Sequence, residues 1–110
     1  MTKDDLVYIT HILERSQKIM EFTAGMNETD FLKDEKTQSA VIRELEVIGE
    51  ASKRISENYR IINTNIPWKL MAGMRDVLIH DYEGVDALMV WDTIQKSVPE
   101  LIENLKKVVK

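Results

Sequence analysis

Three residues with chemically useful side chains, Arg75, His80 and Tyr82, lie close together in the segment MRDVLIHDYEGV, Met74 to Val85. They supply a permanent cation, a group that titrates near neutral pH and a phenol. An imidazole beside a guanidinium suits cleavage of a phosphodiester. The imidazole can deprotonate a ribose 2′-hydroxyl or protonate the leaving oxygen, while the guanidinium binds the non-bridging oxygens as charge develops. This chemistry requires no metal ion.

The spacing of the three residues limits how one helix can use them. On a helix that advances 100° per residue, Arg75 and Tyr82 lie within about 20° of each other, whereas His80 lies about 140° from Arg75. One unbroken helix therefore does not bring Arg75 and His80 to one small ligand. Either the helix loosens before Gly84, or an interface between two subunits brings the groups together.

A structural role for the same residues stays open at this point. An Arg and a His near a helix end often satisfy carbonyl groups or pair with carboxylates, here Asp76 and Asp81. Most tyrosines that flank an apolar stripe, such as Tyr82, bury the ring and leave the hydroxyl in water. Spacing alone does not separate this interpretation from catalysis.

The elements that must position these residues are all expected to be helices. Apolar residues recur at helical spacing, and no alternation typical of strands is present. The sequence predicts an all-α antiparallel bundle of four to five helices. The expected elements are a helix from about Asp4 to Thr23, a short turn over 30–34 capped by Thr29 with Asp30, and helices from about Glu35 to Asn58, from Pro67 to Tyr82, from Asp86 to a break or kink at Pro99, and from Glu100 to about Val109.

The apolar spacing also predicts which side chains form the core. Asp4 or Asp5 is expected to cap the first helix, His11 to be exposed and inert, and the interior Gly49 to mark close approach by another helix or a ligand. The residues expected to face the core include Leu6, Ile9, Ile12, Leu13, Ile19, Met20, Phe31, Leu32, Val41, Leu45, Ile48, Ala51, Ser52, Ile55, Tyr59, Trp68, Leu70, Met71, Met74, Val77, Leu78, Leu88, Met89, Trp91, Ile94, Val98, Leu101, Ile102, Leu105 and Val108.

Length and composition narrow the class of protein. A chain of 110 residues with 44% hydrophobic residues is expected to form one domain over residues 1–110. Because the chain has no cysteine and only two histidines, we expect no disulfide, no metal site and no cofactor. The charged N-terminal stretch has no apolar signal core, and no apolar run reaches the roughly 18 residues of a membrane span. We therefore expect a soluble cytoplasmic protein without membrane contact.

The charge balance is acidic. The net charge of −4 and the pI of about 5.2 argue against affinity for nucleic acid that comes from bulk electrostatics. From Ala51 to Tyr82 the count of basic residues exceeds that of acidic residues by two, so local recognition of phosphates by particular side chains stays open.

Several segments together resemble a known family. The pattern Arg75-x4-His80-x-Tyr82 within GMRDVLIHDYEGVD is similar to the signature of HepT-like toxins, minimal members of the HEPN-domain superfamily. The resemblance extends to RELEVIGEASKRIS over residues 43–56, to the Pro67-Trp68 pair and to the VWDTI…VPEL run through Pro99. It covers most of the chain, from about residue 4 to residue 105.

The resemblance implies a helical bundle that forms a homodimer, in which the motifs of two subunits line a shared cleft and act as a metal-independent endoribonuclease on RNA. It also implies the toxin component of a prokaryotic toxin–antitoxin pair. The expected partner is a minimal nucleotidyltransferase antitoxin, which in some systems silences the toxin by attaching AMP to the motif tyrosine. By position, Arg75 and His80 carry over as catalytic, Tyr82 as a cleft residue and AMPylation target, and Asp76, Glu50 and Arg43 as supporting residues.

One position departs from the superfamily pattern. Asp76 stands where the superfamily frequently has Asn, and an anion there would orient Arg75 or His80 but oppose RNA.

Two other functions are compatible with the same residues. The first alternative is a non-catalytic interaction module that binds, and is AMPylated by, the nucleotidyltransferase partner. The second is a structural helical bundle that has no site.

Overall fold

The computed structural model describes residues 3–72 and 86–109. Three long helices make up most of this part: α1 (Lys3–Phe22), α3 (Glu35–Lys53) and α6 (Ala87–Val108). Two short helices are α2 (Glu28–Lys33) and α4 (Glu57–Ile62), and residues 68–72 form a further helical turn. The described residues contain no strand, so the predicted all-α class is confirmed.

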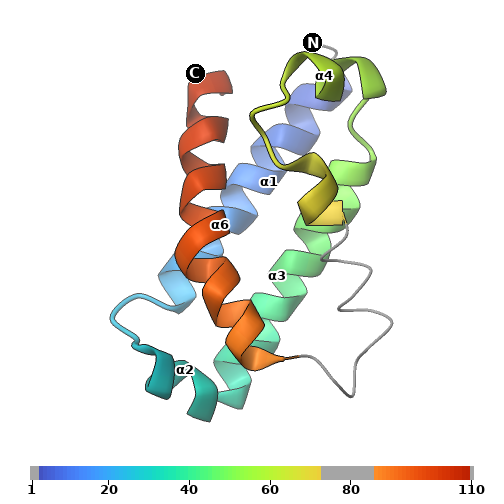
Figure 1. Ribbon diagram of the computed structural model, residues 1–110. Helices are drawn as coiled ribbons and strands as arrows, with labels where there is room; N and C mark the ends of the chain where they lie inside the picture. The colour runs from blue at the N-terminus through green and yellow to red at the C-terminus, as the bar shows by residue number, and fades with distance from the viewer. Residues whose placement is uncertain (1–2, 73–85, 110) are drawn as a thin grey trace.

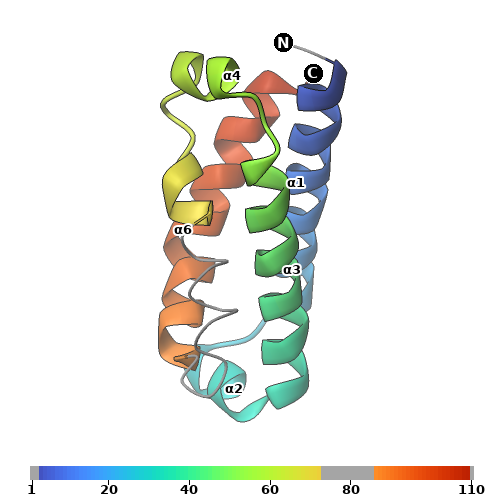
Figure 2. The ribbon, with the colours of Figure 1, turned by 90° about the vertical axis from the view of Figure 1, so that its right-hand side faces the viewer.

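The long helices form an antiparallel bundle. Helix α1 packs against both α3 and α6, and these two run in the direction opposite to α1 (Figures 1 and 2). Helix α2 closes one end of the bundle against α3 and α6 (Figure 1). Helix α4 lies at the other end, where α1 begins and α6 finishes (Figure 1). The predicted bundle architecture is therefore confirmed.

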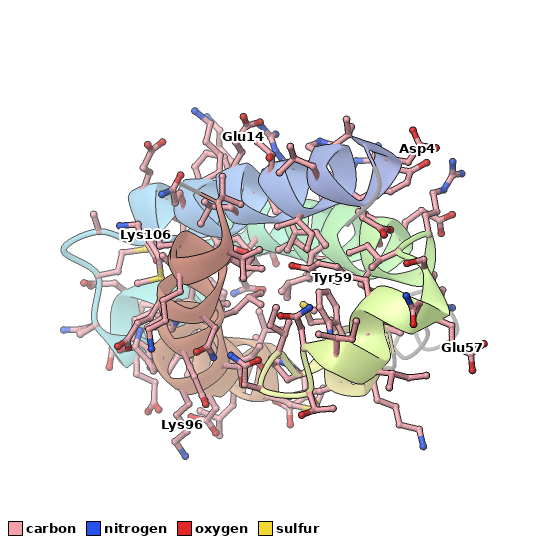
Figure 3. The ribbon with its side chains drawn as sticks, turned by 90° about the horizontal axis from the view of Figure 1, so that it is seen from above. Asp4, Glu14, Glu57, Tyr59, Lys96 and Lys106 are labelled. Carbon is pink, nitrogen blue, oxygen red and sulfur yellow. The ribbon has the colours of Figure 1, made fainter. Side chains whose placement is uncertain are left out.

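The core is built from the inward faces of these helices. Phe31 of α2 packs against Trp91 of α6 with ring centroids 5.3 Å apart, and Tyr59 meets Trp68 edge to face at 5.9 Å. Figure 3 shows Tyr59 directed toward the middle of the bundle. Most side chains predicted to face the core are buried or half-buried. The prediction is wrong for Leu6, Leu32, Leu70, Leu88 and Met89, which are exposed.

These errors share a physical cause. Helical spacing identifies an apolar stripe, but the width of the buried part depends on how many neighbours cover the helix. Helix α1 is covered by α3 and α6 on one side, which leaves Leu6 outside the contact. The predicted core residues Met74, Val77 and Leu78 lie outside the described residues.

Caps define the helix starts, with one correction. Asn27 caps α2: its side chain accepts from the Asp30 amide at 2.8 Å, and its own amide donates to Asp30 Oδ2 at 3.2 Å. The predicted cap at Thr29 is wrong, because this reciprocal capping box starts the helix two residues earlier than a Thr29 cap allows. Asp86 caps α6 as predicted, since its side chain accepts from the amides of Leu88 and Met89.

The predicted helix from Glu35 to Asn58 is two helices. Helix α3 ends at Lys53 and α4 begins at Glu57. Between them, the Ser56 amide donates to Asp5 Oδ1 at 2.8 Å and the Ser56 hydroxyl donates to Asp5 Oδ2 at 2.7 Å. Asp5 thus holds Ser56 from α1, and a contact that spans the chain replaces helical hydrogen bonding. The prediction that Asp4 or Asp5 caps α1 is wrong, because the helix begins at Lys3 and both residues lie within its first turn.

The predicted division into two helices at Pro99 is also wrong, because α6 continues through it to Val108, whereas the alternative of a kink at Pro99 stays a prediction. Proline inside a helix removes one hydrogen bond at a cost of about 3 kcal/mol. The buried side chains of Val98 and Leu101 lie on either side of Pro99 and hold both halves of α6 against the same core. Pro99 itself is exposed, so the carbonyl that loses its partner stays near water.

Candidate functional site

The structure places two of the six site residues predicted from the sequence. Arg43 and Glu50 both lie on α3, whereas Arg75, Asp76, His80 and Tyr82 lie outside the described residues. The angle between Arg75 and His80 therefore stays a prediction. The described site residues can be built up from α3 and its neighbour α1.

Arg43 and Glu50 share one face of α3. They are seven residues apart, which places them within about 20° of each other on a helix. Both line an open groove of about 500 Å³ between α1 and α3. The other lining residues are Tyr8 and His11 of α1, Glu46, Val47 and Ala51 of α3, and Arg54, which follows α3.

The charged groups of this groove form loose pairs. Arg43 Nη1 lies 3.7 Å from Glu46 Oε2, and Arg54 Nη2 lies 3.5 Å from Glu50 Oε1. The two Arg side chains are 74% and 60% exposed. Exposed pairs of this type contribute little to helix stability. The four charged groups therefore lie near one another, but their ion pairs add little to the free energy of folding.

Arg54 has an additional partner across the groove. A hydrogen bond with Tyr8, followed in importance by the Glu50 carboxylate, raises the pKa of Arg54 above its ordinary value. Arginine is protonated near neutral pH in any case, so the guanidinium is a permanent cation in the groove. Sequence reasoning missed both Tyr8 and Arg54, because their proximity depends on how α1 and α3 are aligned in the bundle.

His11 is exposed as predicted, yet it lies in a defined place. It lines the groove with Glu46 and Glu50, and it also borders a second, shallower hollow that Leu6, Val7, Thr10 and Glu14 line. The sequence argument set His11 aside because it points away from the apolar stripe of α1. The three-residue spacing of Tyr8 and His11, which places them on one face, is the signal that was available.

A different pair fixes the walls of the groove. Glu44 of α3 is buried, and its Oε2 lies 3.1 Å from Arg15 Nη1 of α1. Among the described groups, Glu44 Oε2 has no partner that meets hydrogen-bond geometry, so the attraction is coulombic. The pair links α1 to α3, and it thereby sets the distance between the two helices that flank the groove.

The groove is electrically balanced. Arg43 and Arg54 contribute two positive charges, and Glu46 and Glu50 contribute two negative charges. Within the described part of the chain, no three His, Asp or Glu residues are grouped so that they could hold a metal ion. None of the helices described here combines the length and apolar character needed to cross a membrane. The balanced charge suits a partner that carries both signs.

Comparison with protein families gives one match. The model of the family described as "Ribonuclease HepT-like" matches residues 12–108. The matched range contains Arg43 and Glu50, and it also contains the whole segment from Met74 to Val85.

Several proteins with ribonuclease names are similar to this chain. The "Probable ribonuclease HepT" of Thermococcus cleftensis is 47% identical over 103 residues, which is 94% of each chain. The "Putative RNase MJ0127" of Methanocaldococcus jannaschii is 44% identical over 108 residues, 98% of this chain and 89% of that protein. The "Putative RNase TTE0752" of Caldanaerobacter subterraneus subsp. tengcongensis is 41% identical over 102 residues, 93% and 91% of the two chains. No solved structure matches the chain with statistical significance.

Proposed function

The chain belongs to the HepT-like ribonuclease family, and from this premise we propose that it is a metal-independent endoribonuclease and the toxin of a prokaryotic toxin–antitoxin pair. The observation that carries the proposal is the family match over residues 12–108, a range that includes Arg75, His80 and Tyr82 at the spacing of the HepT signature. Residues 1–110 form one domain in this proposal, and the protein acts in the cytoplasm.

The proposed reaction is a transesterification within the RNA chain. The imidazole of His80 accepts the proton of a ribose 2′-hydroxyl or delivers one to the leaving 5′-oxygen. The 2′-oxygen bonds to phosphorus, and the bond from phosphorus to the 5′-oxygen breaks. Arg75 binds the non-bridging oxygens while their charge grows. The products are a 2′,3′-cyclic phosphate and a 5′-hydroxyl.

The proposed active form is a homodimer. On the helix that the sequence predicts for this segment, Arg75 and His80 would lie about 140° apart, and a cleft lined by two subunits would bring such groups to one phosphate more readily than that single helix would. Arg43 and Glu50 are supporting residues in this proposal, and both lie in the α1–α3 groove. Asp76 orients Arg75 or His80 at the expense of some RNA affinity.

The proposed antitoxin is a minimal nucleotidyltransferase that attaches AMP to Tyr82. An adenylate there adds bulk and negative charge to the cleft, which blocks the site and repels RNA phosphates. The acceptor hydroxyl is a phenol, and loss of that one oxygen in Tyr82→Phe removes the modification without removing the ring.

The ribonuclease proposal is tested by incubating the purified protein with RNA in EDTA. The wild type is expected to release fragments with 2′,3′-cyclic phosphate ends, and His80→Ala to cleave about 10²- to 10⁴-fold more slowly. Lys96→Ala, on the exposed surface of α6, is the control and should cleave like the wild type. Equal products from wild type and His80→Ala, or products without cyclic ends, would remove His80 from the reaction.

A second function is favoured by the acidic charge of the chain. The net charge of −4 opposes RNA, so the main role of the protein in this alternative is to bind the nucleotidyltransferase and accept AMP. Intact mass after co-expression with the neighbouring gene product tests it. An adenylate-sized increase that Tyr82→Phe abolishes supports the acceptor role. If that protein also cleaves no RNA when unmodified, the interaction module replaces the nuclease.

A further inference from the structure

Two side chains of the groove between α1 and α3, Tyr8 and Arg54, have no part in the proposed reaction. Tyr8 belongs to α1, and Arg54 directly follows α3. We propose that they form a nucleotide subsite for the RNA substrate, in which the Tyr8 ring stacks on a base and Arg54 binds the phosphate beside it. The inference rests on the proposed function, because RNA is the ligand in both.

Arg54 is a cation that is both oriented and accessible. Its guanidinium donates to the Tyr8 hydroxyl, and Nη2 lies 3.5 Å from Glu50 Oε1. The Arg54 side chain is nevertheless 60% exposed. A guanidinium has five N–H donors, so two partners leave donors for an additional anion. Because contacts from α1 and α3 already restrict this side chain, binding of a phosphate costs it less rotamer entropy.

Tyr8 supplies a flat surface next to this cation. Its side chain is half-buried, packs against the hydrophobic core and lines the groove. Stacking on an aromatic ring is available to every base, so it holds RNA without selecting a sequence. The hydroxyl of the same ring contacts Arg54, so ring and guanidinium are neighbours, as the base and the phosphate of one nucleotide are. The pair therefore offers one contact for each part of a nucleotide.

The groove is large enough for more than one nucleotide contact. Its volume of about 500 Å³ lies within the range of sites that bind small molecules. Arg43 lines it 11 residues before Arg54, which corresponds to roughly 16 Å along α3 and to a difference of about 20° around the helix. A strand of RNA that follows this stripe meets a guanidinium at each end.

The two carboxylates between the arginines are compatible with RNA. Glu46 lies 3.7 Å from Arg43, and Glu50 lies 3.5 Å from Arg54, so each carboxylate has a cation beside it. RNA presents ribose hydroxyl and base amino groups as well as phosphates, and carboxylates accept hydrogen bonds from both. With a net charge of −4 on the chain, we expect binding to depend on these particular contacts and little on bulk charge.

RNA affinity across a salt series tests the role of Arg54. The parent is full-length His80→Ala, so that RNA is not cut, and fluorescence anisotropy of a short fluorescein-labelled single-stranded RNA measures the dissociation constant. Arg54→Gln is expected to raise this constant about 10-fold. It should also reduce the slope of log affinity against log salt concentration by about 0.7, the share of one phosphate of a single strand.

Two substitutions of Tyr8 separate the ring from the hydroxyl. Tyr8→Leu removes the stacking surface and is expected to raise the dissociation constant about 10-fold. The salt slope should stay that of the parent, because the ring carries no charge. Tyr8→Phe keeps the ring and loses the contact with Arg54, so its affinity should stay within about threefold of the parent.

The matched control for Arg54→Gln is Lys96→Gln, which removes the same charge. Lys96 lies on α6 and points away from α1 (Figure 3). We expect both the affinity and the salt slope of this variant to equal those of the parent. Circular dichroism shows whether each variant is folded. A general loss of folding would change Tyr8→Leu and Tyr8→Phe without the difference in salt slope that distinguishes them from Arg54→Gln.

Four results would overturn the inference. They are a parent that binds no RNA, equal RNA affinities of Arg54→Gln and Lys96→Gln, a salt slope that Arg54→Gln leaves unchanged, or a Tyr8→Leu affinity equal to that of the parent. If the Tyr8 and Arg54 variants instead lose affinity for the co-expressed nucleotidyltransferase while RNA affinity is constant, the groove binds protein and the RNA subsite is rejected.

RNA cleavage by the same variants with His80 restored separates this inference from the proposed function. Cleavage by a wild type whose RNA affinity ignores Tyr8 and Arg54 would reject the subsite and leave the nuclease standing. RNA binding that depends on both residues, without cleavage by the wild type, would reject the nuclease and leave the subsite standing.

Discussion

Helix α3 carries ion pairs on two sides, and the two sides differ in burial, in ion-pair distance and in the elements that the pairs join. On the inner side Glu44 is 9% exposed and lies 3.1 Å from Arg15 of another helix. On the outer side the pairs Arg43–Glu46 and Glu50–Arg54 join residues of the same helical stretch at 3.7 and 3.5 Å, with both arginines more than half exposed. The same residue types therefore serve the fold on one side and are available to partners on the other.

The difference follows from the environment of the charges. A charge that is removed from water must keep its partner, because an uncompensated buried charge is costly. A charge that stays in water gains and loses little when its partner changes. Variants on the inner side should consequently change stability strongly, and variants on the outer side should change it little.

The largest effect on stability is expected from Glu44→Ala. Loss of this carboxylate leaves Arg15 beside a buried apolar region, and removal of one partner of a buried pair costs up to 3–5 kcal/mol. Since the Arg15 side chain is 32% exposed and reaches water, we expect about 2–3 kcal/mol. Urea unfolding measures the change. A loss below about 0.5 kcal/mol would place the inner pair in the same class as the outer ones.

A slightly smaller loss is expected from Asp5→Ala. Asp5 is buried and accepts two hydrogen bonds from Ser56, and hydrogen bonds to a charged group contribute about 1.5–3 kcal/mol. We expect a decrease of about 2 kcal/mol in the free energy of unfolding. Asp4→Ala is the matched control, because the neighbouring side chain is exposed. Equal losses for the two variants would mean that the charge near the start of α1 matters and the contact with Ser56 does not.

On the outer side, Glu46→Ala should have a small effect on stability. It removes the pair with Arg43 at 3.7 Å, for which we expect a change of about 0.3 kcal/mol. A loss above about 1.5 kcal/mol in the same urea experiment would erase the distinction between the two sides of α3.

The smallest effect at neutral pH is expected for Tyr59, a third polar group of the interior. Burial first, and the charge of Asp5 second, raise the pKa of Tyr59 above its ordinary value of 10.0. Because the folded pKa is the higher one, the stabilising contribution is complete below pH 10 and is lost as the pH rises through the folded value. Unfolding measured from pH 8 upward should show this loss in the wild type and less of it in Tyr59→Phe. Identical alkaline profiles would contradict the assignment.

The fold was largely predictable because local signals determine most of it. Helical spacing and the Asp86 cap are properties of short stretches, and the bundle follows from them. The wrong predictions of helix boundaries arise where residues distant in the sequence determine the local structure. The spacing from Ala51 to Tyr59 fits one helix, but Asp5, 51 residues away from Ser56, divides it. At Pro99 the local signal indicates a break, and core packing on both sides overrides it.

Less of the candidate site than of the fold could be predicted from the sequence. Arg43 and Glu50 were selected by resemblance, and the structure adds that they share a groove with Tyr8, His11 and Arg54. Tyr8 belongs to α1 and Arg54 follows α3, so only the alignment of the two segments brings them together. The roles of Arg75, His80 and Tyr82 stay predictions, and they depend on chemistry that the RNA experiment measures.

The link from Asp5 to Ser56 also makes one backbone amide a reporter of local opening. The Ser56 N–H donates to Asp5 Oδ1 at 2.8 Å, so its hydrogen exchange requires release of the first turn of α1. Amides whose acceptors lie in their own helix exchange when that helix frays. The Ser56 amide instead exchanges when two segments far apart in the chain separate. Its protection factor therefore measures how stably the start of α1 packs against the segment between α3 and α4.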